Sequence, residues 1–300
     1  MRLASVFALL LVAAPPPTEP APRPIAVIAP MDIELEPLLE RAEISERRTI
    51  AKQVHHIGRL GGRDVVLVRC GRSLVAAAAV AQTVVDHHDP AAIVVLGIAG
   101  GVNPELGIAE VVVPERWGLY QEHVVARPGA DGYEPGPRRR GSNFEGFGMF
   151  VARPQRLTYV DDGIEIDESR FWFEADERLL AAARRSAGGV KLARCTERGD
   201  CVEAAPEVRI AGHGVSGNGF VDNAEYREWI WETFEAHAVD QETAAIAQIA
   251  YGNEVPFIAF RGLSDLAGGH DGQNRARTFA RLAAANAAAA VVAFLELLPV

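Results

Sequence analysis

The sequence is poor in cysteine and has no excess of positive charge. Only three of its 300 residues are Cys, and none follows the N-terminal apolar run, where a lipid anchor would need one. Thirty Lys and Arg stand against forty Asp and Glu, so the formal net charge is −10. Such a charge repels the phosphates of nucleic acids and anionic membrane surfaces, and we expect no nucleic-acid polymer as a partner. The 49% of hydrophobic and 23% of charged residues exclude a disordered chain and a membrane channel.

The cysteines fall into one pair and one single residue. Cys195 and Cys201 flank a polar turn sequence, so in an oxidising compartment they could close a small disulfide loop. Cys70 ends an apolar run and is expected to be a small buried hydrophobe. Neither pattern supplies a nucleophile with a nameable partner.

The N-terminus lacks an apolar run long enough to span a bilayer. Residues 1–14 combine a basic start with a short apolar stretch, which predicts an export signal and a periplasmic or secreted protein without stable membrane association. Residues 15–24 are rich in Pro and predict a stiff spacer. An uncleaved anchor and a cytoplasmic tail are the alternatives.

Several signatures of other enzyme classes are absent. Gly97 to Gly101 contain no GxGxxG, and Ser216 is not in a GxSxG elbow. The pairs His55-His56 and His87-His88 have no Cys or carboxylate at metal-ligand spacing. We therefore expect no metal and no cofactor.

What is present is an alternation of strand and helix patterns. Short apolar runs rich in β-branched residues predict strands, and Ala-rich or amphipathic stretches predict helices. Strands are predicted at 25–30, 54–60, 65–69, 92–96, 108–113, 207–215, 237–239 and 255–260, and helices at 32–42, 73–88, 175–186, 224–234, 242–251 and 274–298. This order predicts a single α/β domain over 25–300, with a central mixed, mainly parallel sheet flanked by helices.

One stretch interrupts the alternation. From about 127 to 171 the sequence is rich in Pro and Gly, includes the basic triplet Arg138 to Arg140, and shows no informative periodicity. We interpret it as an inserted excursion or flap, with the triplet in a solvated loop.

Polar residues gather where the predicted strands end, which is where α/β sheets bind ligands. The segments are 31–34, 97–101, 216–221, and 240–242 together with 261–265. In this order they resemble the methylthioadenosine/S-adenosylhomocysteine nucleosidases of the nucleoside phosphorylase superfamily. The sequence similarity is strongest at 97–104 and 255–269. These two segments resemble a branch of the family that also contains plant bark and vegetative storage proteins.

The resemblance implies a general acid at Asp265. Cleavage of a purine nucleoside needs a proton on N7 of the base, so that the base does not leave as an anion. Burial at a strand end would raise the pKa of Asp265 to suit that task, and Ser264 would orient its carboxyl. The competing interpretation of this Ser-Asp pair is a helix cap for the segment after Leu266.

The resemblance implies three further charged groups at the sugar. Glu34 matches the base that activates water, Glu242 matches the group that holds the ribose hydroxyls, and Arg261 would pair with these carboxylates. Without the resemblance, Glu34 reads as a solvated residue in the first turn of a helix.

The remaining contacts implied are to the base. Phe220 would stack on the purine, and Val221 would offer backbone hydrogen bonds to its edge, although an aromatic residue is more often part of the core. Ala99 and Gly100 belong to the segment Gly97 to Gly101, whose glycines would let the backbone approach the ligand closely.

Some positions depart from the nucleosidase pattern. Gln241 stands where Met is usual, Asp240 replaces Glu, and Ile98 replaces Ser, so the preferred 5′-substituent is open. Arg72 is also unexpected and could contact an anion. We therefore predict hydrolysis of purine nucleosides, with a phosphate-dependent phosphorylase as first alternative and a non-catalytic purine-binding or storage protein as second. The resemblance also implies a homo-oligomer.

Overall fold

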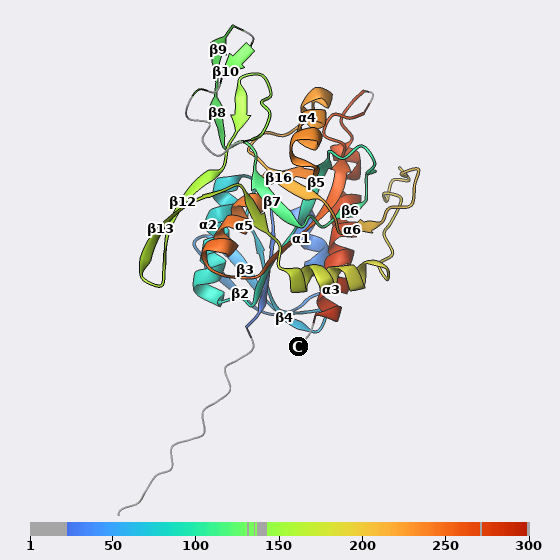
Figure 1. Cartoon of the computed structure of the whole chain (residues 1–300). Helices are drawn as coiled ribbons and strands as arrows, with labels where there is room; N and C mark the ends of the chain where they lie inside the picture. The colour runs from blue at the N-terminus through green and yellow to red at the C-terminus, as the bar shows by residue number, and fades with distance from the viewer. Residues whose placement is uncertain (1–22, 131, 135, 137–142, 271, 299–300) are drawn as a thin grey trace, which may run out of the picture.

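The structure is a computed structural model that describes residues 23–298 except 131, 135, 137–142 and 271. The predicted signal at 1–14, most of the spacer and the triplet Arg138 to Arg140 lie outside the described residues, so the predicted division of the chain stays a prediction. The rest confirms the expected fold class, because one mixed sheet lies between two layers of helices (Figure 1).

The sheet has the strand order β14-β7-β16-β17-β5-β1-β4-β3-β2. In addition, β18 pairs with β5, β6 pairs with β18, and β15 pairs with β6. Its N-terminal half consists of β1 (Ile25–Ala29), β2 (Glu43–Ile50), β3 (Gln53–Leu60), β4 (Arg63–Arg69), β5 (Ala92–Gly101), β6 (Val111–Val112) and β7 (Arg116–Leu119). Its C-terminal half consists of β14 (Trp172–Glu174), β15 (Val208–Arg209), β16 (His213–Ser216), β17 (Ala236–Asp240) and β18 (Phe257–Asp265). The central strands β4, β1, β5 and β18 run parallel, whereas β17 pairs antiparallel with the end of β5.

Helices cover both faces of the sheet (Figure 1). α2 (Leu74–His88) and α5 (Thr243–Gly252) pack together on one face, and α1 (Asp32–Leu39), α3 (Glu177–Ala187) and α6 (Ala276–Leu297) pack on the other. α4 (Ala224–Phe234) packs against β17.

The central strands are buried on both faces, and α6 closes the core over them. α6 is long and apolar enough to cross a membrane, but most of it is buried against β18, β5, α1 and α3. A Cβ atom at Gly262 of β18 would lie 2.1 Å from the carbonyl oxygen of Ala283. Only glycine therefore lets this helix approach the strand so closely.

Three predicted segments differ from the structure. The helix predicted at 32–42 ends at Leu39, and strand β2 follows it. The sequence does not predict β2, because its exposed polar residues lack a buried face. The strand predicted at 207–215 is split into β15 and β16, with Gly212 between them at a φ of 69°. The strand predicted at 108–113 shrinks to Val111–Val112.

Two predicted strands extend further than expected. β5 continues from Leu96 through Gly101, and β18 continues from Phe260 through Asp265. The extensions pair with each other in parallel, with Arg261 opposite Gly97. Hydrogen bonding between the two strands thus overrides the low strand propensity of glycine, and it brings Arg261 and Asp265 into one sheet region.

The excursion at 127–171 folds into antiparallel hairpins beyond the edge of the sheet (Figure 1). β8 (His123–Val125) pairs with β11 (Phe150–Ala152), β9 (Arg127–Gly129) with β10 (Gly132–Glu134), and β12 (Gln155–Asp161) with β13 (Ile164–Arg170).

The cysteines lie as expected. A disulfide joins Cys195 and Cys201 across a loop between α3 and β15, and Cys70 is a buried free thiol.

Candidate active site

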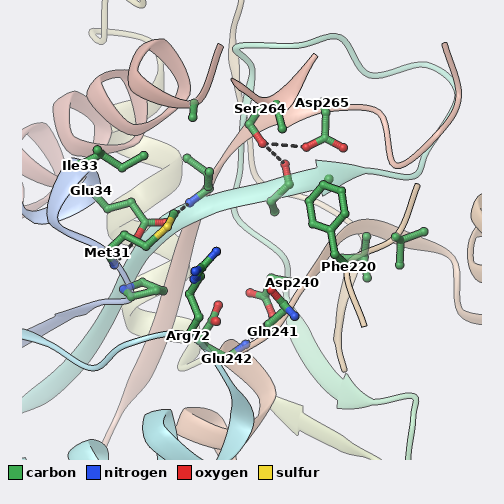
Figure 2. A pocket seen from close by; sticks show the side chains of 18 of the residues that line it. Met31, Ile33, Glu34, Arg72, Phe220, Asp240, Gln241, Glu242, Ser264 and Asp265 are labelled. Atoms are coloured by element: carbon green, nitrogen blue, oxygen red, sulfur yellow. Dashed lines mark hydrogen bonds between the residues drawn. The ribbon is translucent and has the colours of Figure 1, made fainter. Parts of the chain in front are cut away.

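A cavity of about 290 Å³ lies where β1, β5, β17 and β18 end. Its volume is near the lower end of the range for small-molecule sites. All the predicted site residues except Arg261 line it. Figure 2 shows Ser264 and Asp265 at one end, and Arg72 and Glu242 at the other.

Arg261 is the buried centre of the site rather than part of its wall. Its guanidinium is fully buried and forms ion pairs with Asp240, at 2.7 Å, and with Glu242, at 3.6 Å. It also donates hydrogen bonds to Thr243 Oγ1, at 2.9 Å from Nε and 2.6 Å from Nη2. A buried guanidinium is stable only with such partners. Thr243 therefore belongs to the site, although nothing in the sequence singled it out.

Gly97 makes room for this guanidinium. A Cβ atom at position 97 would lie 1.9 Å from Arg261 Nη1 and 2.9 Å from Glu34 Oε1. No side chain fits there without moving one of the two charged groups. The glycine expected to let backbone approach a ligand instead lets an arginine approach the backbone.

Asp240 has a role that the sequence did not reveal, because it marked this residue only as a shortened acid. Its carboxylate accepts hydrogen bonds from the Ser216 hydroxyl and from the backbone N–H groups of Glu242 and Thr243, the latter two at 3.2 Å. It thus ties the end of β16 to the start of α5 while pairing with Arg261. Asp240 is a fully bonded anchor of the cation.

Glu34 is buried at the start of α1 and faces the cavity. Its carboxylate accepts hydrogen bonds from Met31 N, at 2.6 Å, and from Ile98 N, at 2.8 Å. The first bond caps the helix, but the residue is only 1% exposed, so it is no solvated first-turn residue. Loss of hydration raises the pKa of Glu34 to about 7, although Arg261 and the two N–H groups oppose the shift.

Glu242 lies across the cavity from Glu34 and is also buried (Figure 2). Its carboxylate accepts a hydrogen bond from Ser73 N at 3.3 Å, besides the contact with Arg261. Burial raises the pKa of Glu242 to about 7, and the negative charges of Asp240 and Glu34 add to the rise. Ser73 has a φ of 135°, a rare conformation for a residue other than glycine, and in it the N–H points at Glu242.

Asp265 sits at the other end of the cavity among neutral donors. Its carboxylate accepts hydrogen bonds from the Ser264 hydroxyl at 2.8 Å, from Ala267 N at 2.9 Å and from Asn274 Nδ2 at 3.4 Å. Burial raises the pKa of Asp265 above its usual range, and these three donors limit the rise. Asp265 is followed by a turn and not by a helix, so it is not a helix cap.

Asn274 is a site neighbour that the sequence presented only as a helix cap. Its Oδ1 accepts a hydrogen bond from Ala276 N at 2.8 Å near the start of α6, as a cap would. Its Nδ2 points the other way, to Asp265 and to Asp222. No local pattern reports this second contact, because it depends on the turn that brings α6 back to β18.

The loop 217–221 forms the side wall of the cavity. Phe220 is 64% exposed, so it is not a core aromatic, whereas Val221 is buried. Gln241 Nε2 donates a hydrogen bond to Asn218 O at 2.6 Å, which fastens this loop to the end of β17. An exposed aromatic face beside a cavity is available for stacking on a planar ligand.

A metal site does not appear in the described part of the chain. No three His, Cys, Asp or Glu residues among those described lie together as ligands. His55 is buried and stacks on His88, with Nδ1 of one ring 2.9 Å from Nε2 of the other, apart from the cavity residues.

Comparisons with known proteins identify the family of the chain. Residues 24–296 match the family model described as the Phosphorylase superfamily. The chain is 27% identical over 274 residues to a 5′-methylthioadenosine/S-adenosylhomocysteine nucleosidase from Tolumonas auensis, which covers 91% of this chain and 98% of that relative.

Two solved structures share the fold. The nucleosidase of the same name from Neisseria meningitidis, in complex with methylthio-immucillin-A, has a TM-score of 0.67 and 26% identity, covering 91% of this chain and 99% of that one. A futalosine hydrolase from Helicobacter pylori has a TM-score of 0.68 and 19% identity, covering 91% and 97%. Since these two enzymes carry different names, the fold by itself does not fix a substrate. The family match over nearly all of the described residues shows that the chain belongs to the phosphorylase superfamily.

Proposed function

We propose that the protein is an N-glycosidase that hydrolyses purine nucleosides of the methylthioadenosine/S-adenosylhomocysteine type and releases the free base. The observation that carries the proposal is the arrangement of three buried carboxyl groups around one cavity, with Asp265 at one end, Glu242 at the other and Glu34 across the cavity from Glu242. Buried acids whose pKa is raised are typical of sites that move protons. The similarity to nucleosidases supports the same reaction class.

In this proposal the base binds at the Asp265 end. The Phe220 ring stacks on the purine, the backbone of Val221 bonds its edge, and the protonated Asp265 carboxyl donates a proton to N7. The raised pKa of Asp265 supports this role, because a carboxyl group must hold its proton near neutral pH to act as an acid. Ser264 orients the carboxyl through its 2.8 Å hydrogen bond.

The sugar and the attacking water bind between the other two acids. Glu242 accepts hydrogen bonds from the ribose hydroxyls, and ionised Glu34 takes a proton from water as it attacks the anomeric carbon. A pKa of about 7 places Glu34 where a general base works best at neutral pH. Arg261 fixes the carboxylates through its ion pairs, and Ala99 and Gly100 offer backbone close to the ligand.

Water is favoured over phosphate as the acceptor. A phosphate site needs several cationic or amide donors that converge on the anion. Here Glu34 already accepts the N–H groups of Met31 and Ile98, and Arg261 is engaged by Asp240 and Thr243. Base release should therefore proceed without phosphate; a strict requirement for phosphate would replace this proposal with the phosphorylase.

The decisive variant is Asp265→Asn, which keeps the shape of the side chain and removes the acid. We expect kcat for base release from methylthioadenosine, adenosine or inosine to fall by about 10²–10⁴-fold. The matched control is Asp64→Asn, since Asp64 is an exposed carboxylate that pairs with Arg59 and does not line the cavity. Equal activity of Asp265→Asn and wild type would exclude the acid role.

Export and assembly remain proposals. We propose that the protein is exported, because a disulfide between Cys195 and Cys201 suits an oxidising compartment. Cell fractionation would contradict this if the protein stayed in the cytoplasm. Light scattering would test the proposed homo-oligomer. The storage alternative stays a prediction and gains support only if wild type cleaves no nucleoside.

A further inference from the structure

Two arginines line the cavity without a partner in the protein. Arg72 precedes α2 and Arg277 lies in the first turn of α6; both are exposed. Among the described residues, no ion pair or hydrogen bond engages either guanidinium. Figure 2 shows the Arg72 side chain beside Glu242, at the end of the cavity opposite Asp265.

The acids of the cavity do not need Arg72 as a counterion. Asp240 pairs with Arg261, and Glu242 has Arg261 and Ser73 N as its partners. No ion pair joins Arg72 to a described carboxylate, although Glu242 lies near it. Its positive charge is therefore free to meet a ligand.

The surroundings of Arg72 are polar on the side of β17. Gln241 lines the cavity there and uses its Nε2 to hold Asn218 O, which leaves its Oε1 without a partner among the described residues. An uncharged methylthio group would gain little from these polar groups. It would also remove water from the Arg72 guanidinium without offering it a partner.

The order of groups along a nucleoside indicates which part of the substrate would reach Arg72. With the base at Asp265 and the ribose hydroxyls at Glu242, the group that extends past the ribose is the 5′-substituent. We propose that the site selects purine nucleosides whose 5′-substituent carries a negative charge, a carboxylate or a phosphate, and that Arg72 binds this group. This inference rests on the proposed function and specifies its substrate class.

A free phosphate ion would offer Arg72 the same chemistry. It would have to bind beside the sugar, between Glu34 and Glu242, where two acids repel a dianion once they ionise. An anion attached at the 5′ position lies beyond Glu242 and avoids that place. The attached anion is therefore the ligand that the charges favour.

The experiment compares base release from adenosine 5′-monophosphate, adenosine 5′-carboxylate and methylthioadenosine in phosphate-free buffer. We expect wild type to prefer the two anionic substrates by about tenfold in kcat/KM, since a charge-assisted hydrogen bond is worth at least that factor. Arg72→Leu should lower this preference about tenfold, and Arg72→Lys should keep part of it. The matched control is Arg275→Leu, because Arg275 is exposed near Arg277 but stacks on Phe279 outside the cavity.

Each result supports or overturns the inference. Equal kcat/KM for charged and uncharged substrates, or an equal loss on all of them in Arg72→Leu, overturns it. If wild type requires inorganic phosphate and Arg72→Leu no longer does, Arg72 binds free phosphate, and the inference is also overturned. Should wild type cleave none of the three, the proposed function fails separately. Equilibrium dialysis then decides: tighter binding of adenosine 5′-monophosphate than of methylthioadenosine, lost in Arg72→Leu, supports the anion subsite, and equal or absent binding overturns it.

Discussion

Burial raises the pKa of the acids at both ends of the cavity, but different neighbours modify the rise. At the base end three neutral hydrogen-bond donors limit the rise of the Asp265 pKa, and the charge of Asp222 adds to it. At the sugar end the Arg261 guanidinium opposes the rise of the Glu34 and Glu242 pKa values, and the charge of Asp240 adds to it. The base end thus depends on hydrogen bonds, and the sugar end depends on the position of one arginine.

This difference predicts unequal tolerance to change. Leaving a buried neutral donor or acceptor without its partner costs about 1–3 kcal/mol, whereas leaving a buried charge uncompensated costs about 3–5 kcal/mol. Substitutions near Arg261 should therefore reduce both stability and activity, while substitutions near Asp265 should mainly reduce activity.

The largest effect should follow from Gly97→Ala. The added methyl group would overlap Arg261 Nη1, so the buried guanidinium must shift from its position between Asp240 and Glu242. We expect a loss of about 3–5 kcal/mol in the free energy of unfolding and a drop of at least about 100-fold in kcat/KM. Denaturant unfolding and base-release kinetics measure the two.

The control for Gly97→Ala is Gly107→Ala, whose Cβ would have nothing within 4 Å. It separates the displacement of Arg261 from the general effect of adding a methyl group. Wild-type stability of Gly97→Ala would mean that the guanidinium can move freely, and the distinction between the two ends would be lost.

A medium effect is expected on the pH dependence of stability. The pKa of Glu34 is raised from 4.5 to about 7 in the folded protein, so the folded state binds the proton more tightly and stability falls as pH rises toward and through 7. Between pH 5.5 and pH 8 the free energy of unfolding of wild type should fall by roughly 2 kcal/mol more than that of Glu34→Gln.

Activity should change in the opposite direction over the same range. As the proposed base, Glu34 must be ionised, so its titration should make kcat/KM increase as pH rises toward about 7. If the free energy of unfolding changed with pH in the same way in wild type and Glu34→Gln, Glu34 would already be ionised at low pH, and the prediction on stability would be wrong.

The smallest effect should come from Ser264→Ala at the base end. Removing the hydroxyl takes away one donor that lowers the pKa of Asp265 and fixes its orientation. We expect kcat/KM to fall about tenfold, the alkaline limb of its pH profile to move upward, and thermal stability to stay near that of wild type. A uniform fall without a shift of the limb would assign Ser264 a purely steric role.

The sequence predicted the core of the fold and the identity of the cavity residues. The hairpin at Val54 to Leu60 and Val65 to Arg69 closes at Gly61 and Gly62, and both glycines have a positive φ, as tight turns require. The cap of α2 at Ser73 is also confirmed by its hydrogen bond with Ala76 N. Such turns and caps depend only on neighbouring residues, so the local sequence is enough to predict them.

Contacts between distant segments could not be predicted in this way. Asp240 at the end of β17 and Thr243 at the start of α5 reach Arg261 only because β17 and β18 both pair with β5. Asn274 reaches Asp265 only through a turn. β2 was missed because its exposed residues show no apolar alternation. The sequence predicted most of the residues that line the cavity, whereas the contacts between their side chains depend on the topology of the sheet.

The missing side chain at Gly97 also limits how this protein can diversify. Because any larger residue would displace the guanidinium, a new substrate preference cannot arise at position 97 of the strand beneath the cavity. Positions at its rim, such as Arg72 and Gln241, bear no such restriction, since neither holds the buried charges together. Natural or laboratory selection for other nucleosides should therefore accumulate changes at the rim and leave residue 97 alone.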